Sequence, residues 1–337
     1  MPNLNLFRLS AFALLTLTAT GLQPAPASAA EYTMKFGTTT LGDTQHRFGE
    51  RLKEVLEKAT KGRLEVQVYP RSQLGSNQAH VDGLQLGTIE ASMSPIDFFA
   101  GVDPRGGVFS SPFLFKNRAH ANRVLRDKEL FNDIMNIFES KGIVGIMTVG
   151  SADGKYIARN PLRKLTDFQG KKMRVNATDA ERERMRRLGS TAIPMTLGEM
   201  VTSLQSGVID GTMSGISVHV NFNLDSVSKT LLKTEDTLLI AFCGISKKWL
   251  DTLPADLRET IIREGRAMQD VALELANDED STLSKKWLER GGEFIEFSPQ
   301  DHAEMRKLTE TVGADVSAKN PAVKEFYEKV KATAAKY

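Results

Sequence analysis

Residues 45–70 read QHRFGERLKEVLEKATKGRLEVQVYP, and this stretch predicts a helix followed directly by a strand. Its first part repeats apolar residues at helical spacing from Phe48 to Ala59, and Gly62 follows as a stop signal. Its last part, residues 63–70, alternates apolar and polar side chains as a half-buried strand does. A helix that leads into a strand is the repeating unit of an α/β fold.

The same alternation continues along the rest of the chain. It predicts substantially parallel sheets with helices between the strands. The pattern restarts after Gly150, and no low-complexity linker separates the two halves. We therefore expect two lobes joined by several crossings, with a cleft between them. Further helices are expected over residues 76–87, 119–142 (one or two), 179–189 and 197–207, and further strands over 32–37, 89–95, 143–150, 171–176, 191–195, 208–215 and 234–246 (a pair or one long strand).

A long late helix is the second feature of the predicted fold. No proline follows Pro254 until beyond Arg290, and Gly265 is the only interruption in a run of apolar residues at helical spacing. A continuous helix over this run would be about 55 Å long at 1.5 Å per residue. That length exceeds the width of one lobe, so we expect the helix to span both lobes and hold them side by side.

The composition is that of a globular protein without a nucleic-acid partner. Of 337 residues, 41% are hydrophobic and 26% charged, and the formal net charge is +2, too close to balance for a nucleic-acid-binding field. A basic run alternates with acids in a helical context and is interpreted as a solvated helix face. The single cysteine, Cys243, lies in an apolar run and is expected in the core. The basic run comprises Arg182, Arg184, Arg186 and Arg187, and the acids are Glu181 and Glu183.

The N-terminus predicts export. Arg8 precedes an apolar run from Ala11 to Leu22, and residues 27–29 read Ala-Ser-Ala, a cleavage pattern. This is the organisation of a secretory signal peptide over residues 1–30, cut after Ala29 or Ala30. The apolar run is too short to span a bilayer. An exported protein is therefore expected, and we predict that it is a monomer.

Catalytic and metal-binding motifs are missing from the sequence. It contains no G-x-S-x-G, H-E-x-x-H, P-loop or C-x-x-C pattern, and its five histidines lack paired spacing. No metal or cofactor is expected. An exported two-lobed protein without a catalytic set indicates a binding protein whose cleft closes by hinge motion. A buried arginine is the expected anchor for an acidic ligand, because guanidinium pairs bidentately with carboxylate.

Four stretches resemble the periplasmic solute-binding subunits of TRAP (tripartite ATP-independent periplasmic) transporters. Residues 72–93 (SQLGSNQAHVDGLQLGTIEASM) are similar to the family's QLG…G segment. Residues 110–117 (SSPFLFKN) resemble its DLPFLF stretch, with two serines where Asp-Leu is usual. Residues 165–177 (LTDFQGKKMRVNA) resemble D-L-K-G-x-K-x-R-V, and residues 193–215 (IPMTLGEMVTSLQSGVIDGTMSG) resemble P-x-x-x-x-E-x-y-x-a-L-Q-x-G-v-v-D-G.

The resemblance implies an α/β, two-lobed periplasmic binding protein fold with a ligand cleft between the lobes and a long helix spanning both. It assigns residues 31–151 and about 240–282 to one lobe, and residues 152–239 and about 283–337 to the other. It implies a non-enzymatic protein that captures an organic acid and delivers it to the TRAP membrane subunits. Delivery to a sensor kinase and an exported α/β enzyme are the alternatives.

The resemblance also implies a set of ligand-binding residues. Arg174, the last residue of GKKMR, matches the arginine that pairs with the substrate carboxylate; strand alternation alone leaves open whether it faces water or a cavity. Lys155 or Tyr156 would replace a second basic residue. Phe98 stands where some members carry an arginine, and together with Leu197 it favours a monocarboxylate with a hydrophobic body. Ser214 stands where asparagine is common, and Asn77, near the start of a helix, completes the set.

Overall fold

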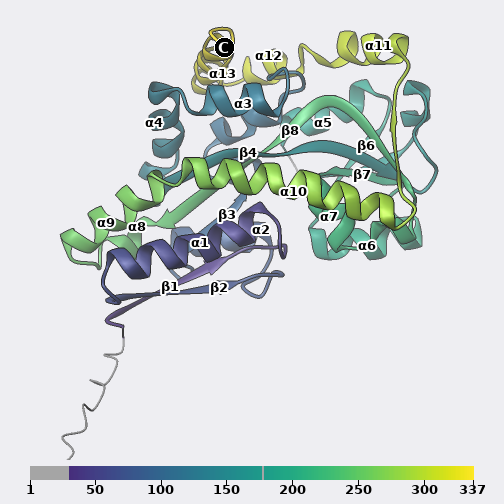
Figure 1. Ribbon diagram of the computed structural model, residues 1–337. Coiled ribbons are helices and arrows are strands. Elements are labelled where there is room, and N and C mark those ends of the chain that lie inside the picture. The colour runs from purple at the N-terminus through teal and green to yellow at the C-terminus, as the bar shows by residue number, and fades with distance from the viewer. Residues whose placement is uncertain (1–29, 177) are drawn as a thin grey trace, which may run out of the picture.

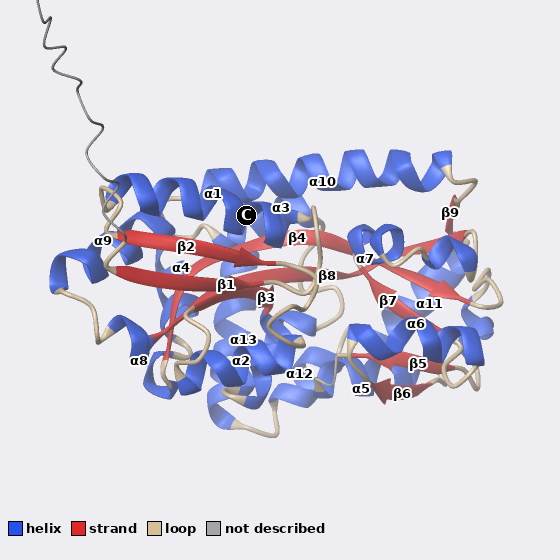
Figure 2. Ribbon diagram, turned by 90° about the horizontal axis from the view of Figure 1, so that it is seen from below, coloured by secondary structure: helices blue, strands red, loops and turns tan. Residues whose placement is uncertain are grey.

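A nine-stranded sheet runs through both halves of the molecule (Figures 1 and 2). The computed structural model describes residues 30–176 and 178–337. The strand order is β2-β1-β3-β8-β4-β7-β5-β6, with β9 paired to β8. The strands are β1 (Tyr32–Gly37), β2 (Leu64–Tyr69), β3 (Ala91–Pro95), β4 (Ile143–Ala158), β5 (Lys172–Val175), β6 (Thr191–Pro194), β7 (Gly211–Ser214), β8 (Thr230–Ser246) and β9 (Glu293–Glu296).

Helices cover both faces of this sheet (Figures 1 and 2). Most follow the ranges that the apolar periodicity predicts, and residues 119–142 form two helices. The helices are α1 (Thr44–Ala59), α2 (Asn77–Leu86), α3 (Arg118–Leu125), α4 (Lys128–Asn136), α5 (Asp179–Arg187), α6 (Leu197–Ser206), α7 (Ile216–Asn221), α8 (Lys247–Leu250), α9 (Ala255–Arg266), α10 (Gln269–Glu289), α11 (Pro299–Thr309), α12 (Val312–Ser317) and α13 (Pro321–Ala334), with short 3-10 helices η1 (Ile96–Gly101) and η2 (Pro104–Ser110) among the connections.

The sheet is mixed: most strand pairings are parallel, as predicted, and a long antiparallel pair joins the two parallel groups. Strands β1, β2 and β3 are parallel, as are β5, β6 and β7. Between these groups, β4 and β8 form a long antiparallel pair that also meets β3 and β7 antiparallel. They are 16 and 17 residues long and pass from one half of the molecule to the other. Register shifts along β4, such as the one between Asp153 and Lys155, mark bulges in this ladder.

The late helical run is broken, so the prediction of one continuous helix is wrong. α9 ends at Arg266, α10 begins at Gln269, and the two residues between them, Ala267 and Met268, lie outside both helices. Gly265 is not the break, because it lies inside α9. α10 nevertheless contacts α1 in the first half and α7 in the second, so this single helix extends along both (Figure 1).

Four apolar clusters fill the layers between sheet and helices. Two lie in the first half, one under α1, α9 and α10 and one under α2, α3, α4 and α13. The other two lie in the second half, one under α5 and α11 and one under α6 and α7. Cys243 is fully buried in the first cluster, as predicted. Within the described residues, no helix is long and apolar enough to cross a membrane.

The C-terminal segment divides between the two halves. α11 packs on α5, whereas α13 packs on η2 and α3. The sequence interpretation placed all of residues 283–337 with the second lobe, and the packing of α13 differs from it. We propose the same two lobes with α13 reassigned to the first, because Val323, Phe326 and Val330 are buried there.

Candidate functional site

A cavity lies where loops of the two halves meet, at the carboxyl ends of β1, β3, β5 and β7. Its empty space, counted together with the part that is open to solvent, is about 520 Å³. The carboxyl ends of parallel strands are the usual place for a ligand in an α/β sheet. Five of the expected binding residues line it together: Arg174, Phe98, Ser214, Leu197 and Asn77.

Arg174 reaches this cavity from β5. Its side chain is only 3% exposed, whereas its neighbour Lys172 on the same strand is exposed. The Nε–H donates to the carbonyl of Met195 at 3.0 Å, and Nη2 is buried without any hydrogen-bond partner. Burial lowers the pKa of Arg174, while Glu181 and Asp97 act in the opposite sense. Since arginine stays protonated in proteins, the cavity contains a buried cation with a free donor.

Asp97 and Glu181 form a polar network behind Arg174. Asn176 Nδ2 donates to Asp97 Oδ2 at 3.0 Å, and the backbone N–H of Asn176 donates to Glu181 Oε1 at 3.2 Å. Glu181 also closes the capping box of α5 with Thr178. Burial, with added repulsion from Glu181, raises the pKa of Asp97 to about 7. This network joins residues from both halves of the chain, Asp97 from the first half and Asn176 and Glu181 from the second, and holds them around Arg174.

Tyr156 and Arg184 belong to a separate buried cluster, which corrects two expectations. Tyr156 is 1% exposed and donates from its hydroxyl to Asp236 Oδ2 at 3.2 Å, so it does not line the cavity. Arg184 Nη1 lies 3.3 Å from the same carboxylate oxygen and is also buried. The basic run is therefore not a uniformly solvated face. Glu181 and Arg184 point inward from α5, while Arg182 and Arg186 remain outside.

Lys155 likewise does not line the cavity, contrary to its predicted role as a second cation. It follows the register shift on β4, and its Nζ lies 3.4 Å from Asp280 Oδ1 on α10. This places it in a different hollow, beside Arg118 and Asp153. With Lys155 paired to α10, Arg174 has no second lysine or arginine beside it among the described residues that line the cavity.

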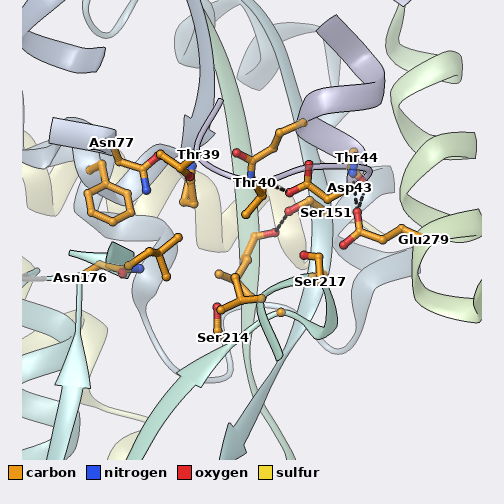
Figure 3. A pocket seen from close by; sticks show the side chains of 18 of the residues that line it. Thr39, Thr40, Asp43, Thr44, Asn77, Ser151, Asn176, Ser214, Ser217 and Glu279 are labelled. Carbon is orange, nitrogen blue, oxygen red and sulfur yellow. Dashed lines mark hydrogen bonds between the residues drawn. The ribbon is translucent and has the colours of Figure 1, made fainter. Parts of the chain in front are cut away.

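Asp43 and Glu279 are two buried carboxylates in the same cavity (Figure 3). Asp43 is the N-cap of α1 and accepts from the backbone of His46 at 3.0 Å and from the Thr40 hydroxyl. Glu279 Oε2 accepts both the backbone N–H and the hydroxyl of Thr44 at 2.5 Å. Burial, together with repulsion from Asp43, raises the pKa of Glu279 to about 7, and burial raises that of Asp43 as well.

Hydroxyl and amide groups make up much of the remaining wall. The sequence led us to expect an apolar pocket, and Phe98, Leu197, Val218 and Leu239 do line it. Polar residues line it beside these apolar side chains. The polar residues that the sequence interpretation missed are Thr39, Thr40, Asp43, Thr44, Gln45, Ser151, Asn176, Ser217 and Glu279.

Only part of this polar wall carries a sequence signal. Residues 38–45, TTTLGDTQ, follow the first predicted strand and contain an Asp directly before a predicted helix. The sequence could therefore have predicted a helix N-cap at the carboxyl end of that strand. Glu279 has no such signal. It lies in the middle of α10 and reaches Thr44 from 235 residues away in sequence.

A second hollow, walled by both halves, adjoins the cavity, and we call it the mouth. Ser72, Gly75 and Gln78 come from the first half, and Met195, Thr196 and Gly198 from the second. It shares Thr39, Asn77, Phe98, Asn176 and Leu197 with the cavity. In the described residues no group of three or more His, Cys, Asp or Glu side chains is placed to hold a metal ion.

Comparison with known proteins gives matches over most of the chain. A family model described as bacterial extracellular solute-binding protein, family 7, matches residues 36–320. The 2,3-diketo-L-gulonate-binding periplasmic protein YiaO of Escherichia coli is 28% identical over 272 residues, 80% of this chain and 82% of that protein. The C4-dicarboxylate-binding periplasmic protein DctP of Rhodobacter capsulatus is 27% identical over 318 residues, 91% and 95% of the two chains.

Solved structures match as well. A TRAP periplasmic solute-binding protein from Xanthobacter autotrophicus with bound β-D-galacturonate has a TM-score of 0.82 and 25% identity, over 89% of this chain and 99% of that one. One from Haemophilus influenzae with bound L-gulonate has a TM-score of 0.84 and 24% identity, over 90% and 99% of the two chains, which establishes likeness of fold.

Proposed function

Because this chain belongs to family 7 of the bacterial extracellular solute-binding proteins, we propose that it captures an organic carboxylate in the cavity between its two lobes and that Arg174 holds the carboxylate. The protein is a solute-binding protein of the TRAP type and not an enzyme. It serves transport by delivering a carboxylate to the membrane subunits, which is the role of this family.

The unpaired Nη2 of Arg174 is the observation that supports the carboxylate assignment. A buried donor without a partner costs free energy, on the order of 1–3 kcal/mol and more for a charged group. A ligand carboxylate would supply the missing acceptor at the point where the cavity already contains a cation. Phe98, Leu197, Ser214 and Asn77 then contact the body of the ligand, since they line the same space.

Location and partners follow from the same membership. Proteins of this type are periplasmic, and we propose export through a signal peptide cut after Ala29 or Ala30. That segment lies outside the described residues, and the mass of the secreted protein tests it.

We also propose that the chain acts as a monomer with no nucleic-acid partner. Delivery to a sensor kinase is the alternative, and co-purification with the membrane subunits separates the two.

Calorimetric titration of Arg174 variants tests the carboxylate assignment. Suitable probes are L-gulonate, D-galacturonate and succinate. Arg174→Ala should lose affinity by roughly a hundredfold to several thousandfold, because leaving one partner of a buried ion pair alone costs about 3–5 kcal/mol, at about 1.4 kcal/mol per tenfold. Arg174→Lys should recover only part of it, since a point charge lacks the planar fork of guanidinium.

Lys172→Ala is the matched control. It removes one positive charge from the same strand, two residues away, but from an exposed side chain. It should bind the probes as the unmodified protein does. Near-normal affinity in a folded Arg174→Ala protein would contradict the assignment of Arg174 as the anchor.

A further inference from the structure

One side of the cavity is built from hydrogen-bond acceptors. Figure 3 shows Asp43, Thr44 and Glu279 gathered on this side, with Asn77 and Asn176 on the other. The charged groups acting on Arg174 are Asp97 and Glu181, and no described ion pair joins Arg174 to Asp43 or Glu279. The cavity therefore has a cationic donor in one part and two carboxylates in another.

Three hydroxyl groups on this side already donate their protons within the protein. Thr40 donates to Asp43, and Thr44 donates to Glu279. Ser151 donates to the carbonyl of Leu239 at 3.1 Å. A hydroxyl has one proton and two lone pairs, so these groups can offer a ligand only acceptor sites. Gln45 adds a carbonyl oxygen, Oε1, that is buried without a partner.

The two carboxylates have acceptor capacity left as well. A carboxylate has about four lone-pair sites, and the protein donors that reach Asp43 and Glu279 are fewer than the two groups could accept. No lysine or arginine in the described part of the chain forms an ion pair with either of them. Burial raises the pKa of both acids, and repulsion from Asp43 raises that of Glu279 further, as expected for acids without a lysine or arginine beside them.

From this arrangement we infer that the ligand is a carboxylate whose other end carries hydrogen-bond donors, hydroxyl or ammonium groups, and that Asp43 and Glu279 receive them. The inference rests on the proposed function, since Arg174 must hold the carboxylate for the donor end to lie against the acids. It excludes simple dicarboxylates, because a second carboxylate lying against Asp43 and Glu279 would find no lysine or arginine besides Arg174 to pair with among the described residues that line the cavity. It also excludes fatty monocarboxylates, whose apolar end would leave the acceptors unpaired.

Four six-carbon probes of similar length separate these classes: D-gluconate, 6-aminohexanoate, hexanoate and adipate. Calorimetric titration should rank D-gluconate or 6-aminohexanoate at least about tenfold above both hexanoate and adipate, the effect of one hydrogen bond to a charged group. Preference for D-gluconate identifies the donors as hydroxyls, and preference for 6-aminohexanoate identifies an ammonium group. Equal or tighter binding of hexanoate or adipate overturns the inference.

Two charge-removing variants test the residues. Glu279→Gln should reduce the preference for the donor-bearing probe over adipate by about tenfold or more. Asp43→Asn should act in the same direction while keeping a good helix cap. The control is Glu274→Gln, which removes an acid from the exposed face of the same helix α10 and should leave the ranking unchanged. If the order of probe affinities is unchanged in both variants, Asp43 and Glu279 do not receive the donors of the ligand.

Failure of this inference differs from failure of the proposed function. If the probes bind and Arg174→Ala abolishes binding, but their ranking shows no preference for donors, only the present inference is wrong. If a probe binds equally well to the unmodified protein and to Arg174→Ala, Arg174 is not the carboxylate anchor. The proposed function and the present inference are then both wrong.

Discussion

Glu279 is the residue whose ionisation should show most directly in the stability of the ligand-free protein. Its pKa is about 7 in the folded chain against an ordinary value of 4.5. When folding raises the pKa of an acid, its protonated form contributes fully to the free energy of unfolding at pH values below the pKa in the unfolded chain. This contribution is lost as the pH rises through the pKa in the folded chain. Glu279→Gln should therefore raise the free energy of unfolding at pH 8 by up to about 3 kcal/mol relative to the unmodified protein, but not at pH 4.

Urea unfolding at both pH values measures this difference. Asp97 and Asp43 titrate in the same direction, but they are present in both proteins, so the comparison isolates Glu279 and its coupling to Asp43. Glu274→Gln on the same helix should change stability equally at both pH values. A Glu279→Gln protein that is no more stable at pH 8 than at pH 4, relative to the unmodified protein, would show that the pKa of this carboxyl is not raised in the folded protein.

Phe98 and Phe99 are adjacent residues with different predicted roles. Phe98 lines both the cavity and its mouth, so Phe98→Ala should shift relative affinity toward bulkier acids, measured by competition between a small and a bulky probe. Phe99 is fully buried, with ring centroids 5.2 Å from Phe138 and 5.0 Å from Phe242.

Phe99→Ala supplies the contrast. It should cost about 3–5 kcal/mol of stability and leave probe selectivity alone. Parallel loss of affinity for small and bulky acids in Phe98→Ala would remove Phe98 from the wall of the site.

The sequence could predict a site residue only where the neighbouring residues indicate its position. Arg174 lies at a strand end marked by the preceding GKKM and by a resemblance, and the structure places it in the cavity. Lys155 was expected there from its position alone, but a bulge on β4 and a partner on α10 redirect it. Glu279 depends on how a distant helix docks, and no local pattern encodes that.

At the scale of elements, apolar periodicity located most helices but could not detect the break at Ala267–Met268, because no proline or isolated glycine marks it. Gly265 looked like the interruption and is in fact a packing position. A Cβ there would lie 2.8 Å from Ile146 Cδ1 and 3.1 Å from its Cβ. The long strands β4 and β8 were underestimated for a similar reason, since burial on both faces removes their alternation.

Gly265→Ala should therefore destabilise the protein, although helix propensity alone predicts a gain of up to about 1 kcal/mol. Overpacking against the buried Ile146 should cost about 1–3 kcal/mol. Thermal unfolding measures the sign. Gly198→Ala in α6 is the control, because the nearest atom to its added Cβ is Thr196 Oγ1 at 3.9 Å, and it should not destabilise. An increase in melting temperature for Gly265→Ala would refute the close packing of α9 on β4.

At the scale of the whole molecule, the described elements that connect the two lobes include β4, β8 and α10. β4 and β8 cross as a bulged antiparallel pair, and α10 contacts helices of both lobes. Continuous strands with local register shifts can bend while each lobe keeps its own apolar core. The cavity lies between those cores and is lined from both lobes, so ligand binding and the angle between the lobes should be coupled.

This coupling predicts that a bound carboxylate narrows the mouth. Spin labels on Gln78→Cys in α2 and Thr202→Cys in α6, both exposed and on opposite lobes, should report a shorter or sharper distance distribution when a saturating probe is added. The native Cys243 is fully buried and should not take the label. A pair within the first lobe, Gln78→Cys with Lys58→Cys, should not respond. The Arg174→Ala background should abolish the response at the same probe concentration, because closure is driven only by the ligand's higher affinity for the closed state. A mouth distance that stays constant in the unmodified background, with calorimetry showing the probe bound, would mean that the two lobes form a rigid receptor.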